Sequence, residues 1–187
     1  MKHDCGYHLL FSNPKLVEDL FRNFVNEEWV NILDFNSLER VNARLHAEGL
    51  ERRDGDIIYR VKDNRGKETY LYLMLEFQSS VDYLMALRVL VYVGLLYQHL
   101  AKTDCSTSQC RHLPPVFPVV LYNGEKAWHA RTEIRDLIDY KRGDRLSYFQ
   151  PKMRYYLIDE SDYPLGKPGS VAGVLFKLEN CYNASQL

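Results

Sequence analysis

The sequence predicts an α/β fold in which a mixed sheet is flanked by helices. Three observations lead to this prediction. An amphipathic helical pattern, two apolar strands joined by a polar turn, and a long apolar helix follow one another between residues 14 and 102. Further strand and helix patterns alternate between residues 116 and 179. Such an order is typical of helices packed on a sheet, and a length of 187 residues favours a single domain.

The N-terminal part is predicted to hold two helices. Ser12-Asn13-Pro14 offers a cap residue followed by proline in the first turn, and apolar residues then recur at helical spacing to about Asn26. The Asn36-Ser37 pair is placed to cap a second, shorter helix through Leu45, with Gly49 at its end.

Residues 57 to 77 are predicted to form a β-hairpin. Ile57–Val61 is one strand, residues 63–67 have the composition of a turn, and Thr69–Phe77 is the second strand. The faces of the second strand follow from its period of two: one carries Tyr70, Tyr72, Met74 and Glu76, and the other Leu71, Leu73, Leu75 and Phe77. Since both faces are largely apolar, this strand is expected to be central and covered on both sides.

The second half is predicted to add a buried helix, two strands and a last helix. Residues 82–102 are apolar nearly all round, but the central Arg88 favours a helix inside a soluble protein over a membrane span. The strand 116–122 contains Pro118, which indicates an edge position or a bulge. The remaining predictions are a helix at 135–140, a strand at 153–158 and a helix at 170–179.

Composition indicates a soluble globular protein. Hydrophobic residues make up 46% and charged residues 26%, and the net charge of −1 leaves room for a nucleic-acid surface only as a local patch. The four cysteines have no disulfide-framework spacing, and the N-terminus has no apolar signal region. A reducing cytoplasm is therefore the expected location.

Two carboxylates stand at matching ends of the predicted hairpin. Asp56 opens the first strand and Glu76 lies near the end of the second, so antiparallel pairing is expected to bring them together. Neighbouring carboxylates repel one another unless a cation lies between them. Mg²⁺ binds one or two protein carboxylates and keeps waters for a substrate phosphate. Two alternatives stay open: Asp56 as a turn residue, and Glu76 as an ion-pair partner of Arg60 or Arg88.

Basic residues gather in two places. The first group surrounds the predicted hairpin and comprises Arg52, Arg53, Arg60, Lys62, Arg65 and Lys67; the second comprises Lys141, Arg142 and Arg145. Each residue is able to contact a DNA phosphate, but an ordinary solvated edge explains the same pattern.

Several motifs together resemble one family. They are His3-Asp4 with Leu10–Pro14, Arg53–Val61, Tyr70–Ser80, Met85–Tyr92, and Pro118–Gly124 with Trp128. The chain resembles the PD-(D/E)XK nuclease fold and, more narrowly, the Rpn family of recombination-promoting nucleases, the YhgA-like transposase group. The resemblance runs from residue 3 to about residue 160, which is most of the chain.

The resemblance implies a restriction-endonuclease-like αβββαβ core at about residues 10–160 of a single domain, 1–187, with a C-terminal region of longer relatives absent. It also implies a metal-dependent DNA endonuclease of low sequence specificity, linked to recombination or mobile elements. Double-stranded DNA is the implied partner, with a homodimer as one assembly and no membrane association.

Site residues follow from the same resemblance. Asp56, Glu76 and the backbone carbonyl of Phe77 would hold Mg²⁺, with Mn²⁺ or Ca²⁺ as substitutes. Gln78 stands where this fold usually has lysine and would orient a water by hydrogen bonds. The replacement of lysine motivates an alternative, a catalytically weak nuclease-like module for DNA binding or assembly. A third hypothesis makes the 81–100 helix a dimer surface.

Overall fold

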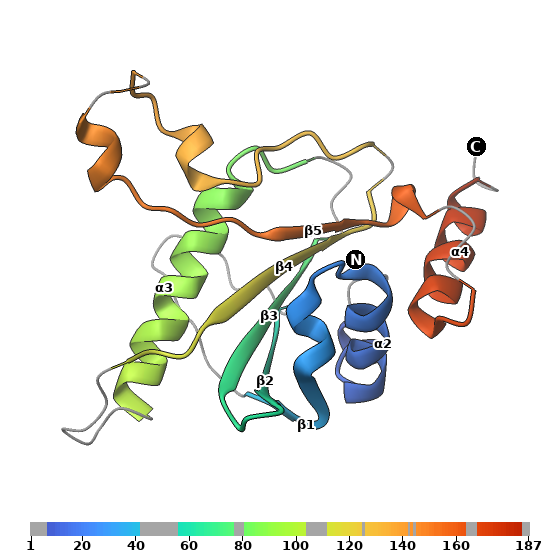
Figure 1. Ribbon diagram of the computed structural model, residues 1–187. Helices are drawn as coiled ribbons and strands as arrows, with labels where there is room; N and C mark the ends of the chain where they lie inside the picture. The colour runs from blue at the N-terminus through green and yellow to red at the C-terminus, as the bar shows by residue number, and fades with distance from the viewer. Residues whose placement is uncertain are drawn as a thin grey trace.

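The computed structural model describes most of the 187-residue chain. The described residues are 7–41, 56–76, 81–103, 112–124, 126–141, 143, 145–163 and 168–184, and the side chains of 74–76 and 179–184 lie outside the description. Figure 1 shows a twisted sheet with helices on both of its faces.

Within the described residues, five strands form one mixed sheet in the order β1-β2-β3-β4-β5. Their bounds are β1 Leu33–Arg40, β2 Ile57–Asp63, β3 Glu68–Glu76, β4 Val116–Tyr122 and β5 Tyr156–Asp159. The first three strands pair antiparallel, whereas β3, β4 and β5 run parallel. The mixed sheet is therefore as predicted.

Among the described residues, three α-helices with defined bounds flank the sheet: α2 Pro14–Phe24, α3 Met85–Thr103 and α4 Val171–Ala184. Residues 7–10 are helical as well. Short 3-10 segments are η1 Glu28–Ile32, η2 Ile134–Leu137, η3 Arg145–Phe149 and η4 Glu160–Asp162. Helices α2 and α4 lie on one face and α3 on the other (Figure 1). The order α2-β1-β2-β3-α3-β4 confirms the αβββαβ arrangement. In the part of the chain that the structure covers, none of the helices combines the length and apolarity that a bilayer crossing needs.

The central position predicted for the second hairpin strand is confirmed by β3. Leu71 and Leu73 pack into the core on the α2 side, and Tyr70 and Tyr72 pack into the core on the α3 side. All four are almost completely buried, so both faces of β3 exclude water. A polar group at this strand is therefore costly unless it finds a partner.

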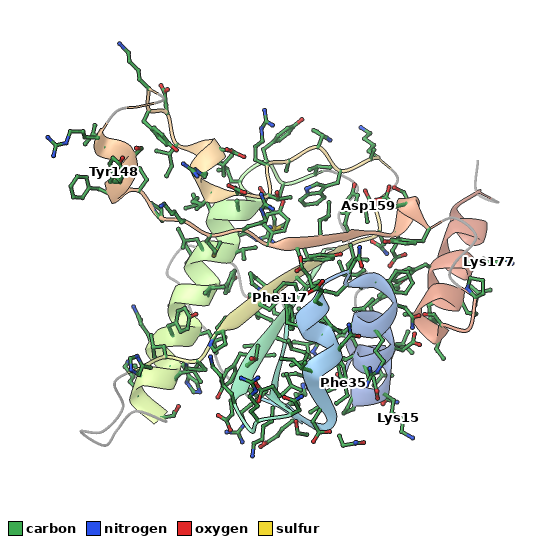
Figure 2. The ribbon with its side chains drawn as sticks, viewed as in Figure 1. Lys15, Phe35, Phe117, Tyr148, Asp159 and Lys177 are labelled. Carbon is green, nitrogen blue, oxygen red and sulfur yellow. The ribbon has the colours of Figure 1, made fainter. Side chains whose placement is uncertain are left out.

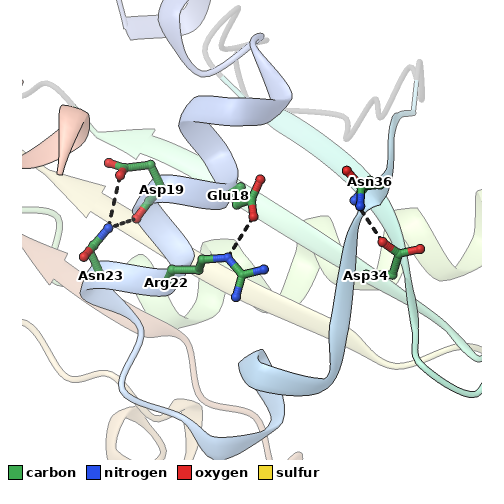
Figure 3. A network of polar contacts seen from close by, with 6 residues as sticks. All are labelled: Glu18, Asp19, Arg22, Asn23, Asp34 and Asn36. Atoms are coloured by element: carbon green, nitrogen blue, oxygen red, sulfur yellow. Dashed lines mark hydrogen bonds and ion pairs between the residues drawn. The ribbon is translucent and has the colours of Figure 1, made fainter. Parts of the chain in front are cut away.

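The two helices of the first face are fastened by Asp19 of α2. Its carboxylate Oδ2 accepts hydrogen bonds from Ser170 Oγ at 2.7 Å and from the backbone N–H of Ala172 at 2.8 Å. These donors lie at the N-terminus of α4, where backbone N–H groups have no partner within the helix. Asp19 also accepts from Asn23 Nδ2 at 3.1 Å (Figure 3).

The helix predicted from the Asn36-Ser37 pair is wrong, because these residues lie in strand β1. Leu33 and Phe35 are buried and alternate with exposed neighbours, which is a strand pattern. Ser37 does not cap a helix: its hydroxyl donates to the Asp34 carbonyl at 2.6 Å and accepts from Lys62 N–H at 2.8 Å. It thereby satisfies backbone groups where the β1–β2 register shifts. The rest of that predicted helix, residues 42–50, lies outside the described residues.

The edge position predicted for Pro118 is wrong for strand β4 as a whole. β4 lies between β3 and β5, but its pairing with β5 begins only at Val119. Pro118 therefore lies just before the part of the strand that pairs on both sides. At this position the missing backbone N–H of proline is tolerated. The helix predicted at 135–140 is the 3-10 segment η2, and the strand predicted at 153–158 starts later, at Tyr156.

Candidate functional site

The residues at one end of the sheet include both predicted carboxylates. Ile57 of β2 pairs with Leu73 of β3, so Asp56 is level with Met74, and Glu76 ends β3 two residues further on. Backbone positions related in this way are diagonal neighbours, ~7–8 Å apart. The side chain of Glu76 lies outside the description, and so do Phe77, Gln78 and Arg53.

Asp56 is held by a buried tyrosine that was not among the predicted site residues. The Tyr72 hydroxyl donates to Asp56 Oδ2 at 2.7 Å from within the α3-side core. Burial, the charge of Asp56 and this hydrogen bond raise the pKa of Tyr72 well above its usual value. The phenol therefore keeps its proton and acts as a donor. The sequence signal for this contact was the position of Tyr72 on the same strand face as Glu76, because a buried tyrosine hydroxyl needs a hydrogen-bond partner.

An ion pair joins the first turn of α3 to the segment just before it. Arg88 Nη1 lies 2.6 Å from Asp82 Oδ2, and Asp82 Oδ1 accepts the N–H of Leu84 at 2.9 Å. The charge of Arg88 opposes part of the rise in the pKa of Tyr72. Arg88, one of the arginines considered as a partner for Glu76, is thus engaged with Asp82.

The neighbouring parallel strands bring a further carboxylate to this end of the sheet. Glu76 pairs with Tyr122 of β4, which pairs with Asp159 of β5. Asp159 is buried and was not among the predicted site residues. It accepts from the N–H of Trp128 at 3.1 Å, and from the N–H and hydroxyl of Ser161 at 3.0 and 2.7 Å. Because its carboxylate already accepts three hydrogen bonds from the protein, Asp159 holds the neighbouring loops in place and is not a candidate metal ligand.

The hairpin cations lie at the opposite end of β2 from Asp56. Six residues separate Asp56 from Lys62, or about 20 Å at the rise of a strand. Lys62, Arg65 and Lys67 are exposed around the turn. Arg60 is an ion-pair partner instead, with Glu39 at 2.6 Å and Glu68 at 3.5 Å. A single phosphate could not bridge the turn and the carboxylates.

Glu18, an acidic residue of the first helix, lies on the surface. Its Oε1 accepts from Arg22 Nε at 2.8 Å (Figure 3), as an exposed i,i+4 pair. This geometry supports a solvated helix face.

The chemistry of the sheet end suits a hard, oxygen-seeking cation. Mg²⁺ needs only one or two protein carboxylates and keeps several waters. Asp56 supplies one carboxylate, and because a carboxylate has several acceptor positions, one bond from Tyr72 is compatible with metal binding. No cluster of three or more His, Cys, Asp or Glu side chains suited to a metal occurs in the described segments.

Comparison with known proteins identifies the family of the chain. Residues 1–168 match the family model described as "Putative transposase, YhgA-like". The chain belongs to this family. Most of the described fold, from α2 to the end of β5, lies inside the matched range.

Curated members related to this YhgA-like chain carry nuclease names. It is 27% identical over 125 residues to "Recombination-promoting nuclease RpnD" of Escherichia coli O157:H7, covering 67% of this chain and 46% of the relative. It is 26% identical over 124 residues to "Recombination-promoting nuclease RpnC" of E. coli K12, covering 66% and 39%. The chain thus spans less than half the length of these two relatives.

A further relative carries a different name. "Putative inactive recombination-promoting nuclease-like protein YjiP" of E. coli K12 is 28% identical over 90 residues, covering 48% of this chain and 86% of the relative. No solved structure gives a significant match.

Proposed function

We propose that this chain is a Mg²⁺-dependent DNA endonuclease with little sequence preference, linked to recombination. The proposal depends on one observation: Asp56 and Glu76 lie at the same end of the sheet, on adjacent paired strands. The names of the RpnD and RpnC relatives give the reaction class. Double-stranded DNA is the proposed substrate, and a dimer with two such sites would cut both strands.

In this proposal Asp56 and Glu76 hold the cation, together with the carbonyl of Phe77. When bound, the ion supplies Lewis-acid chemistry: it activates water and offsets charge on the phosphate. Tyr72 keeps its proton and holds Asp56 in one orientation. Gln78, in place of lysine, aligns the attacking water by hydrogen bonds but brings no positive charge.

The direct test is nicking of supercoiled plasmid by the purified protein. With Mg²⁺, the plasmid is expected to be converted to open circles. Removing the metal with EDTA should abolish this conversion, and adding Mn²⁺ should restore it. Calorimetry of metal binding runs beside it. DNA binding by gel shift without nicking, and without heat from Mg²⁺ or Mn²⁺, would contradict the proposal and indicate a binding or assembly module.

Replacing Tyr72 by phenylalanine is expected to weaken metal binding about 10-fold, because partners that orient a metal ligand typically contribute 10- to 100-fold. Since the pKa of Tyr72 lies well above 10, the phenol is protonated at pH 7 and at pH 9. The loss should therefore be equal at both values. Isothermal titration with Mn²⁺ measures it.

Tyr70→Phe is the matched control, because Tyr70 is buried on the same face of β3 but toward the hairpin turn. Its metal affinity should stay within about twofold of the wild type. Equal affinities for Tyr72→Phe and wild type would show that the hydroxyl does not position a metal ligand.

A further inference from the structure

An excursion of the chain between η2 and β5 carries the most exposed aromatic side chains in the described structure. It runs from Ile138 to Tyr155 and contains η3. Tyr148 is 80% exposed and Phe149 83%, and Leu146 beside them is 57% exposed. Figure 2 places Tyr148 at the outer edge of the molecule, far from the sheet. Single exposed apolar residues are ordinary, but three on one turn are unusual.

The base of this excursion is fixed to the body of the protein. The N–H of Ile134 donates to the Met153 carbonyl at 3.1 Å, and the N–H of Tyr155 donates to the Thr132 carbonyl at 3.2 Å. Ile134 is buried against α3. Within η3, Gln150 Nε2 donates to the Leu146 carbonyl at 3.0 Å. The exposed rings are therefore presented by a closed and anchored loop.

The charge of the excursion favours an anionic partner. In the sequence, residues 138–155 contain five basic residues and two acidic residues, whereas the whole chain has a net charge of −1. Among the described basic residues, Lys141, Arg145, Lys152 and Arg154 are exposed, and Arg154 forms an ion pair with Glu133. Exposed rings flanked by cations are what single-stranded nucleic acid binds, because bases stack on the rings while the cations face the backbone. A protein interface is usually depleted in lysine.

The excursion starts from the same end of the fold as the candidate site. Tyr155, which closes it, accepts a hydrogen bond from Trp128 Nε1 at 3.1 Å. The Trp128 ring packs edge-on against Tyr122, the residue of β4 that pairs with Glu76. DNA on the candidate site would extend toward η3, which stands out beyond α3 (Figure 1).

We infer that η3 is a stacking platform for unpaired bases, and that the preferred substrate is DNA with a gap, overhang or other single-stranded region. This inference rests on the proposed nuclease function and specifies its substrate class. A base inside an intact duplex is already stacked on its neighbours, so Tyr148 and Phe149 reach only bases that have left the stack.

The test compares a fluorescein-labelled duplex with the same duplex containing a short single-stranded gap. Binding is measured by fluorescence anisotropy in EDTA without divalent cations, and cleavage separately in Mg²⁺. The double substitution Tyr148→Ala with Phe149→Ala is expected to weaken binding to gapped DNA about 10- to 100-fold, and binding to intact duplex less than about threefold. Both side chains are exposed, so the variant should fold normally.

Three further variants sharpen the result. Tryptophan at both positions should restore binding, whereas leucine at both should not, because leucine is apolar but cannot stack. The matched control is Val174→Ala with Leu178→Ala on α4, whose side chains are 54% and 60% exposed. This pair should bind both DNAs as the wild type does.

Several outcomes would overturn the inference. Full affinity of the leucine variant for gapped DNA would rule out stacking. If the Tyr148→Ala, Phe149→Ala variant loses binding to phosphatidylserine vesicles but binds DNA normally, η3 contacts a lipid surface. If the variant has a lower oligomer mass but binds DNA normally, η3 contacts a second copy of the chain. If the Tyr148→Ala, Phe149→Ala variant binds gapped DNA and nicks plasmid as the wild type does, the stacking platform is refuted and the proposed nuclease function stands. Failure of the wild type to bind any DNA would refute both proposals.

Discussion

Asp56→Asn is expected to lower Mg²⁺-dependent DNA nicking by about two to three orders of magnitude, or ~3–4 kcal/mol of transition-state stabilisation. Asparagine has nearly the same size and keeps an oxygen that accepts from the Tyr72 hydroxyl. What it loses is the negative charge that holds a divalent cation. The effect should therefore appear in activity and metal binding, with little change in thermal unfolding.

Initial rates of plasmid nicking measure this prediction, with circular dichroism melting as the check on folding. Asp34→Asn is the control: it is an exposed carboxylate in β1 whose Oδ1 accepts the Asn36 N–H at 3.1 Å (Figure 3), a bond that asparagine can keep. Its rate should stay within about twofold of the wild type. Nicking by Asp56→Asn at the wild-type rate would mean that cleavage does not depend on this carboxylate.

The elements predicted correctly are those in which the buried positions form a regular apolar pattern in the sequence. β3 is apolar on both faces because it lies in the middle of the sheet with helices above and below. Helix α2 was recognisable from its cap, where Asn13 Oδ1 accepts the Lys15 N–H at 3.0 Å, and from its buried stripe. In both elements, local pattern and tertiary packing agree.

β1 was missed because it is an outer strand with one covered face and a register shift. Only Leu33 and Phe35 keep the buried alternation, and the polar Asn36-Ser37 pair then interrupts it. Side chains of this kind are equally common at helix caps. Only the partner strand decides between the two, since Ser37 bonds the backbone of Lys62 in β2.

The carboxylates of the candidate site were predictable because hairpin pairing is local, whereas their surroundings were not. Tyr72 meets Asp56 through that same hairpin, but its role depends on burial by α3. The hairpin cations were grouped with the site by sequence proximity, yet they lie at the far end of β2. Adjacency in sequence does not distinguish the two ends of a strand.

Arg88→Met is expected to destabilise the fold by ~2–3 kcal/mol, because it leaves Asp82 without its ion-pair partner at the start of α3. Breaking a buried pair on one side typically costs 3–5 kcal/mol. The side chains of Arg88 and Asp82 are 12% and 26% exposed, so solvent lowers that cost. Methionine retains much of the apolar stem. Urea unfolding measures the change.

The source of this loss can be separated by a second substitution. Adding Asp82→Asn to Arg88→Met removes the unpaired charge but keeps an oxygen for the Leu84 N–H, so at least about 1 kcal/mol should be recovered. Arg22→Met, which breaks the exposed pair with Glu18, should cost less than about 1 kcal/mol. If the double variant were no more stable than Arg88→Met, the arginine would act through packing. Its charge would then have no part in fastening α3 beside Tyr72 and Asp56.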